Sequence, residues 1–142
     1  MALPNGAGGY QLGDGNLSEI SFSNTNAPVA LTGAAVTITP SDLAAGVCTM
    51  DAGGTDAGAY VFPTGALLDA AFPSLKVGST FSCSFINIGD NAANDVTFTA
   101  GTGNTLVGND VIQDALTKTS NTSGTFRFRK TGDAAYSIYR VS

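Results

Sequence analysis

The chain has 142 residues, the length of a single domain, since domains most often hold roughly 100 to 150 residues. Hydrophobic residues make up 43% of it and charged residues only 12%, which argues against a disordered chain and predicts a surface of Ser, Thr, Asn and Gly. A net charge of −5 argues against nucleic acid or an anionic membrane as a partner.

The N-terminal segment, residues 1–16, is rich in glycine and contains only isolated apolar side chains. Such a composition cannot form a core of its own, so we expect an N-terminal arm. The arm either frays or becomes ordered when Tyr10 and Leu12 dock on a neighbouring subunit.

The start of the sequence lacks the basic residues and the apolar run of a signal peptide. No stretch approaches the roughly 20 apolar residues of a membrane-spanning helix. These features predict synthesis and folding in a cytosol, where thiols stay reduced. Cys48 and Cys83 are therefore expected to be buried thiols rather than a disulfide. A disulfide between them is the alternative if the protein later meets an oxidising medium.

Beyond the arm, short runs of alternating apolar and polar residues are separated by turn residues, a pattern typical of a β-sandwich or barrel. In the clearest run, 79–88, Phe81, Cys83 and Phe85 share one face of the predicted strand. We expect one domain over residues 17–142, an all-β, antiparallel, jelly-roll-like β-sandwich. The predicted strands are 17–23, 34–39, 47–50, 58–62, 79–88, 95–100, 104–107, 110–113, 123–130 and 135–141.

Two short helices are expected between the strands. Residues 63–73 place leucine, alanine and phenylalanine at helical spacing between two prolines. Residues 39–46 begin with Thr39 as a helix cap and Pro40 in the first helical position, and Asp42 completes a capping box. Neither helix is long enough to change the fold class.

The last two predicted strands form a hairpin about Gly132-Asp133, because Gly in the first central position suits a type II′ turn. This register pairs Lys130 with Ala135 and Phe126 with Tyr139. It predicts a core face of Phe126, Phe128, Tyr139 and Val141 and an opposite face of Arg127, Arg129, Tyr136, Ile138 and Arg140.

Three of the six basic residues, Arg127, Arg129 and Arg140, thus share one predicted face. Their guanidinium groups suit pairing with carboxylates of a partner chain, and the alternative is a solvated sheet face. With Tyr10 and Leu12, these arginines are the predicted contacts to another subunit or to a larger assembly.

Catalytic patterns are missing from the sequence. The chain contains no His, the commonest general base, metal ligand and triad member. Glu19 is the only Glu, and nothing in the sequence singles out a pair of Asp residues. The glycine-rich run 101–108 lacks the third Gly of a dinucleotide fingerprint, and the loop with Asp51 and Asp56 lacks the ligand spacing of an EF-hand. We therefore predict no enzyme and no catalytic, cofactor or metal site.

A series of short motifs occupies the second half of the chain. They are Leu67-Leu68, Val77-Gly78 followed by Phe81, Ile86-Asn87, the turn 100–103 and the run 123–127. In this order they resemble a repeated module in virion proteins of marine and other tailed phages and of some large viruses, over roughly residues 58–142. Such modules occur in head decoration proteins and in fibres, and this chain has no long shaft. The resemblance therefore implies a small head decoration (cement) protein.

The sequence thus predicts a non-enzymatic structural protein on the outside of a bacteriophage capsid, made in the host cytoplasm. Copies are expected to form a homotrimer that bridges major capsid subunits and stabilises the lattice, with no cofactor, nucleic acid or membrane as partner. The alternative is a carbohydrate- or host-surface-binding module of a fibre or appendage, in which Tyr10, Tyr60, Tyr136 and Tyr139 stack on the ligand. A small hydrolase that uses an Asp pair is a third possibility.

Overall fold

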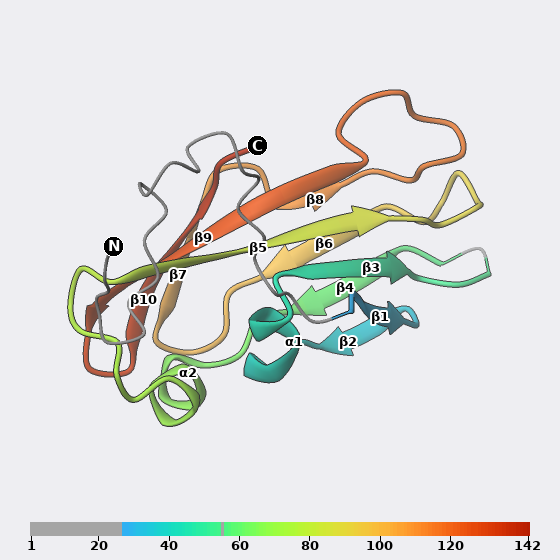
Figure 1. The fold of residues 1–142 in the computed structure, drawn as a ribbon. Coiled ribbons are helices and arrows are strands. Elements are labelled where there is room, and N and C mark those ends of the chain that lie inside the picture. Colours follow the sequence, from blue (N-terminus) through green and yellow to red (C-terminus); the bar gives the residue numbers. More distant parts are fainter. Residues whose placement is uncertain (1–26, 55) are drawn as a thin grey trace, which may run out of the picture.

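The computed structural model describes residues 27–54 and 56–142, whose strands form two sheets (Figure 1). The first sheet has six strands in the spatial order β1 (Val29–Thr32), β3 (Val47–Asp51), β5 (Thr80–Asn87), β9 (Ser123–Gly132), β10 (Ala135–Arg140) and β7 (Asn104–Val107). The second sheet has four strands in the order β2 (Ala35–Thr37), β4 (Gly58–Val61), β6 (Val96–Thr99) and β8 (Val111–Ile112). Two short helices, α1 (Pro40–Ala44) and α2 (Gly65–Ala71), lie in the connections. The prediction of a mostly β protein with two short helices is confirmed.

From β1 to β6 the chain crosses from one sheet to the other at every step. One circuit is the passage from the first sheet to the second and back, and each circuit adds one strand to each sheet. Strands β1, β3 and β5 therefore run parallel to one another, and so do β2, β4 and β6. Helices α1 and α2 lie in the connections that return from the second sheet to the first. The sheets are therefore mixed, and the prediction of antiparallel, jelly-roll-like sheets is wrong in this respect. An alternating pattern reports which face of a strand is buried, not the direction of its neighbour.

The two sheets enclose one core, centred on Phe62, which directly follows β4. The Phe62 ring stacks on Phe98 of the second sheet with 5.1 Å between centroids. It also meets Phe126 and Phe128 of the first sheet edge-on, at 5.2 Å each. Buried residues of both sheets and both helices surround this cluster: Leu31, Ile38, Leu43, Cys48, Met50, Tyr60, Leu68, Cys83, Phe85, Val96, Ile112, Tyr136 and Ile138. Burial of these side chains is the main favourable contribution to the stability of the fold.

Side-chain caps begin both helices. Thr39 Oγ1 accepts a hydrogen bond from the N–H of Asp42 at 3.2 Å, and Asp42 Oδ2 accepts one from the N–H of Thr39 at 2.8 Å. The predicted capping box is therefore confirmed. Thr64 caps α2 in the same way, accepting from the N–H of Leu67 at 3.3 Å. Neither helix of the described residues is long and apolar enough to cross a membrane.

The predicted strands within the described residues are confirmed, with ends that differ by at most two residues. Strand β1 was not predicted, because it is short and follows Pro28 directly. The predicted strand 17–23 and the arm 1–16, with Tyr10 and Leu12, lie outside the described residues.

The closing hairpin has a different register from the predicted one. Asp133 and Ala134 form its turn in place of Gly132-Asp133, and a bulge shifts the pairing between Ala135 and Tyr136. The core-facing side chains are therefore Phe126, Phe128, Lys130, Tyr136, Ile138 and Arg140, and the outward-facing ones are Thr125, Arg127, Arg129, Ser137 and Tyr139. The predicted core positions of Tyr139 and Val141, and the predicted outer positions of Tyr136, Ile138 and Arg140, are wrong.

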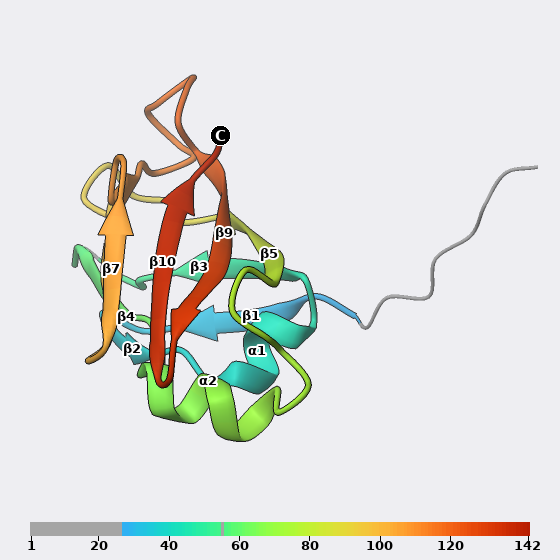
Figure 2. The same cartoon turned by 90° about the vertical axis from the view of Figure 1, so that its left-hand side faces the viewer.

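A tertiary contact holds this turn. Ala134 has a φ of 50°, in the left-handed region that costs a residue with a Cβ roughly 1–2 kcal/mol. Its N–H donates to Asp69 Oδ2 of α2 at 2.8 Å, and Figure 2 shows α2 next to the turn between β9 and β10. The two residues are 65 positions apart in the sequence, so no local pattern predicts the contact.

Candidate interaction surface

The outer face of the first sheet carries two rows of side chains across β5, β9 and β10. The first row is Ser82, Arg127 and Tyr139, and the second is Thr80, Arg129 and Ser137. We call these six residues the β9 face. Its only charged groups are the two guanidinium groups, and the hydroxyl groups beside them add hydrogen-bonding partners.

Strand alternation holds Arg127 and Arg129 on the β9 face. Phe126 and Phe128, which share β9 with them, are fully buried, so the intervening side chains point to solvent. Pairing with β5 on one side and β10 on the other fixes the backbone beneath both arginines. Neither arginine forms an ion pair within the part of the chain that the structure describes. As far as residues 27–54 and 56–142 are concerned, both guanidinium groups are thus available for carboxylates of another molecule.

Arg140, the third predicted contact residue, lies on the core-facing side of β10. Its guanidinium carbon is 5.3 Å from the centroid of the Phe126 ring, and burial lowers the pKa of Arg140 from its usual value. The group donates to five oxygen atoms of its own chain: Ser142 O, Asn109 O, Val111 O, Asn121 Oδ1 and Ser123 O. An arginine has five N–H donors, so Arg140 has none left for a partner.

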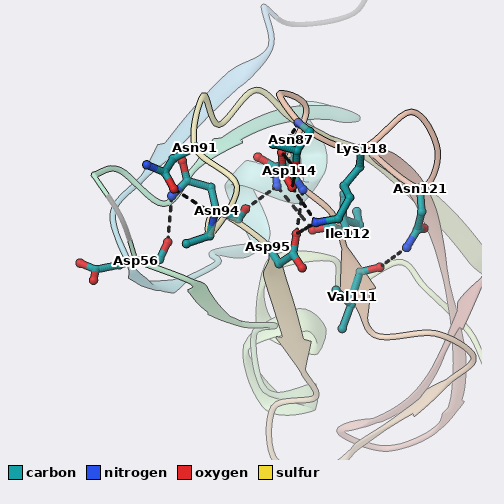
Figure 3. A network of polar contacts seen from close by, with 12 residues as sticks. Asp56, Asn87, Asn91, Asn94, Asp95, Val111, Ile112, Asp114, Lys118 and Asn121 are labelled. Atoms are coloured by element: carbon teal, nitrogen blue, oxygen red, sulfur yellow. Dashed lines mark hydrogen bonds and ion pairs between the residues drawn. The ribbon is translucent and has the colours of Figure 1, made fainter.

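Buried amides and carboxylates hold the loops at the end of the molecule where β5 leads to β6 and β8 leads to β9 (Figure 3). Asn87 and Asn94 are fully buried, and Asn87 Nδ2 donates to the carbonyl oxygen of Asn94 at 2.7 Å. Asp114 accepts from the N–H of Thr117 at 2.6 Å and from Lys118 Nζ at 3.0 Å. These bonds, that of Thr117 above all, lower the pKa of Asp114 to about 2. The network joins loops of the protein to one another.

Asn94 also binds the acidic loop that contains Asp51 and Asp56. Its Nδ2 donates to three backbone oxygens of that loop: Gly53 O at 3.4 Å, Gly54 O at 3.3 Å and Asp56 O at 2.9 Å. These three bonds hold the backbone of the loop against Asn94. Within residues 27–54 and 56–142, no three His, Cys, Asp or Glu side chains form a group suited to a metal ion. Sequence reasoning missed Asn94, for which a turn rich in asparagine is the only local signal.

A second polar cluster joins α2 to the hairpin. Asp69 Oδ1 accepts from Lys130 Nζ at 2.7 Å and from the Tyr136 hydroxyl at 2.7 Å. The hydrogen bond from Lys130, followed by that from Tyr136, lowers the pKa of Asp69 to about 2. Burial, together with the neighbouring carboxylate, raises the pKa of Tyr136. The cluster therefore supports the fold through an ion pair in which Lys130 is buried and Asp69 is partly exposed.

The four tyrosines considered for carbohydrate stacking have different environments. Tyr60 and Tyr136 are 0% and 1% exposed, so neither can stack on a ligand, and that part of the alternative is wrong. The Tyr60 hydroxyl donates to the carbonyl oxygen of Leu31 at 3.0 Å inside the core. Tyr139 lies on the β9 face, and Tyr10 is outside the described residues.

A pocket of about 290 Å³ lies between α1, the segment after α2, and β5. Leu43, Phe72, Leu75 and Phe81 contribute its apolar side chains, and Ser82 also lines it. No titratable side chain lines it, so the pocket holds neither a general acid nor a general base.

No family model, no curated protein and no solved structure matches this chain.

Proposed function

We propose that this protein is a non-enzymatic decoration protein that binds the outer surface of a phage capsid. The observation that carries the proposal is the β9 face, where Arg127 and Arg129 are exposed and unpaired within the described residues. The other polar clusters, around Asp69, Asp114 and Arg140, are bonded within the chain. The resemblance of the motifs to virion modules indicates the kind of particle.

The chemistry of the β9 face suits an acidic protein surface. Each guanidinium group presents its donors in a plane that matches the two oxygens of a carboxylate. Tyr139, next to Arg127, supplies a ring with a polar tip, and Arg and Tyr are the residue types enriched at the energetic centres of interfaces. The proposed partners are the major capsid protein and neighbouring copies in a homotrimer, with no cofactor, nucleic acid or membrane involved.

The mechanism is thermodynamic. A protein that binds the assembled lattice but not the free subunits stabilises the lattice by mass action. Many copies on one particle add avidity, so each contact needs only modest affinity. The protein would be made in the host cytoplasm and act at the capsid surface.

The test is co-sedimentation of the purified protein with heads of the phage that encodes it. We expect the wild-type protein to sediment with heads and the Arg127→Ala/Arg129→Ala variant to lose at least tenfold in affinity, the effect of about 1.4 kcal/mol. Lys76→Ala is the matched control, because it removes an exposed base outside the β9 face and should bind like the wild type.

Three outcomes would contradict the proposal at different points. Wild-type protein that stays in the supernatant argues against a head protein. Equal binding by the double variant argues against the β9 face alone. A monomer in sedimentation equilibrium at the concentrations used for binding argues against the trimer.

A further inference from the structure

Cys48 and Cys83 lie on neighbouring parallel strands, β3 and β5, and both point into the core. Their exposed fractions are 0% and 1%, so the predicted burial is confirmed. The two sulfur atoms are 3.8 Å apart, in van der Waals contact. A disulfide has a sulfur–sulfur distance of about 2.05 Å. Closing this gap requires each sulfur to move by about 0.9 Å.

We infer that Cys48 and Cys83 form a disulfide when the protein folds, or opens transiently, in an oxidising medium. The two sulfurs are each other's neighbours in a space closed to solvent, so an intramolecular bond is favoured over a mixed disulfide with a small thiol. This inference goes beyond the proposed function and does not depend on what the protein binds.

The oxidant is a small-molecule disulfide such as oxidised glutathione. One cysteine, as the thiolate, attacks a sulfur of the oxidant, which forms a mixed disulfide and releases one small thiolate. The other cysteine then loses its proton and attacks the mixed disulfide, which forms the Cys48–Cys83 bond and releases the second small thiolate. The protein gives up two electrons and two protons, and the oxidant is reduced to two thiols.

The two sulfur atoms are close enough for a hydrogen bond, in which either atom can be the donor. This contact lowers the pKa of Cys48 and raises the pKa of Cys83. The resulting bond would link the neighbouring parallel strands β3 and β5 covalently.

The experiment refolds the full chain in buffers with rising ratios of oxidised to reduced glutathione, so that access to the buried thiols does not limit the reaction. We expect both thiols to disappear in an assay under denaturing conditions and the intact mass to fall by two hydrogen atoms, without a glutathione adduct. The 35-residue separation of the cysteines predicts a melting temperature roughly 10 °C higher than that of the reduced protein.

Cys48→Ala and Cys83→Ala are the matched controls. Either change destabilises the core, so the informative quantity is the difference between oxidised and reduced samples of one protein. That difference should vanish in both variants. Two titratable thiols in the wild type after oxidative refolding, a stable glutathione adduct, or a lower melting temperature on oxidation would each overturn the inference.

Discussion

The two faces of the β9–β10 hairpin use the same residue types in opposite ways. On the core-facing side, Lys130 pairs with Asp69 and Arg140 donates to five oxygen atoms of its own chain. On the outer side, Arg127 and Arg129 have no ionic partner among the described residues. An arginine of this hairpin therefore stabilises the fold when its side chain faces the core, and it is available for a partner when its side chain faces outward. Substitutions on the two faces should therefore have different effects on stability and binding.

The largest change in the free energy of unfolding is expected from a substitution on the core-facing side, at Phe126. The ring is fully buried against Phe62 and Phe98, so Phe126→Ala leaves a cavity and should cost about 3–5 kcal/mol in the free energy of unfolding. Urea unfolding followed by circular dichroism measures this loss. Val107→Ala on the outer side of β7 is the control and should cost about 0.5 kcal/mol or less. A loss below about 1 kcal/mol for Phe126→Ala would show that the core is not organised as described.

The second largest loss of stability is expected from substitution of Arg140, and it tests whether this side chain stabilises the fold. Arg140→Met keeps the apolar stem but leaves several backbone oxygens without donors, so we expect a loss of about 1.5–3 kcal/mol by the same urea assay. Arg140→Lys should recover only part of it, because an ammonium group cannot reach five acceptors at once. If Arg140→Met is as stable as the wild type, Arg140 does not stabilise the fold and resembles Arg127 and Arg129 in this respect.

The third effect is a pH dependence from the core-facing ion pair. The pKa of Asp69 falls from its ordinary value of 3.8 to about 2 in the folded protein. A lowered pKa means that the carboxylate stabilises the folded state above pH 4 and that this contribution is lost as the pH falls towards 2.

Melting curves between pH 5 and pH 2 measure this loss. Asp69→Asn should melt with a shallower pH dependence than the wild type. Asp114, whose pKa is also about 2, accounts for part of the remaining slope, so the Asp69→Asn/Asp114→Asn variant should show the shallowest curve. If the melting temperature depends on pH equally in all three proteins, the two carboxylates are not the source of the acid sensitivity.

The smallest effect on stability is expected from the outer side. Arg127→Ala/Arg129→Ala removes two exposed side chains, so the free energy of unfolding should change by no more than about 0.5 kcal/mol per site. Loss of capsid binding at unchanged stability would sharpen the difference between the two faces. A clear loss of stability would mean that the outer arginines also support the fold.

Local patterns predicted the elements of this protein but not their pairing. The capping box of Thr39 and Asp42 and the alternation in β5 depend on neighbouring residues, so the sequence shows them directly. The parallel order of the strands depends on the path of the whole chain. Strand alternation alone does not report it.

The candidate site was predictable in part for the same reason. Arg127 and Arg129 alternate with buried Phe residues inside one strand, and the structure places both on the outer face. The place of Arg140 depends on the hairpin register, which a bulge shifts by one residue. A one-residue shift moves every later side chain of the strand to the other face, which is why the error affected Tyr136, Ile138 and Arg140 together.

The alternation of the chain between the two sheets has a consequence for how the protein folds during synthesis. Strand β1 pairs with β3 through Val29 and Cys48, and β3 pairs with β5 through Val47 and Ser84, so each parallel pairing must close a long loop. Strand β9 pairs with β5 but follows all of these strands in the sequence, so it is synthesised after them. The six-stranded sheet can therefore be completed only after β9 and β10 have been translated, and its long-range pairings should make this step slow.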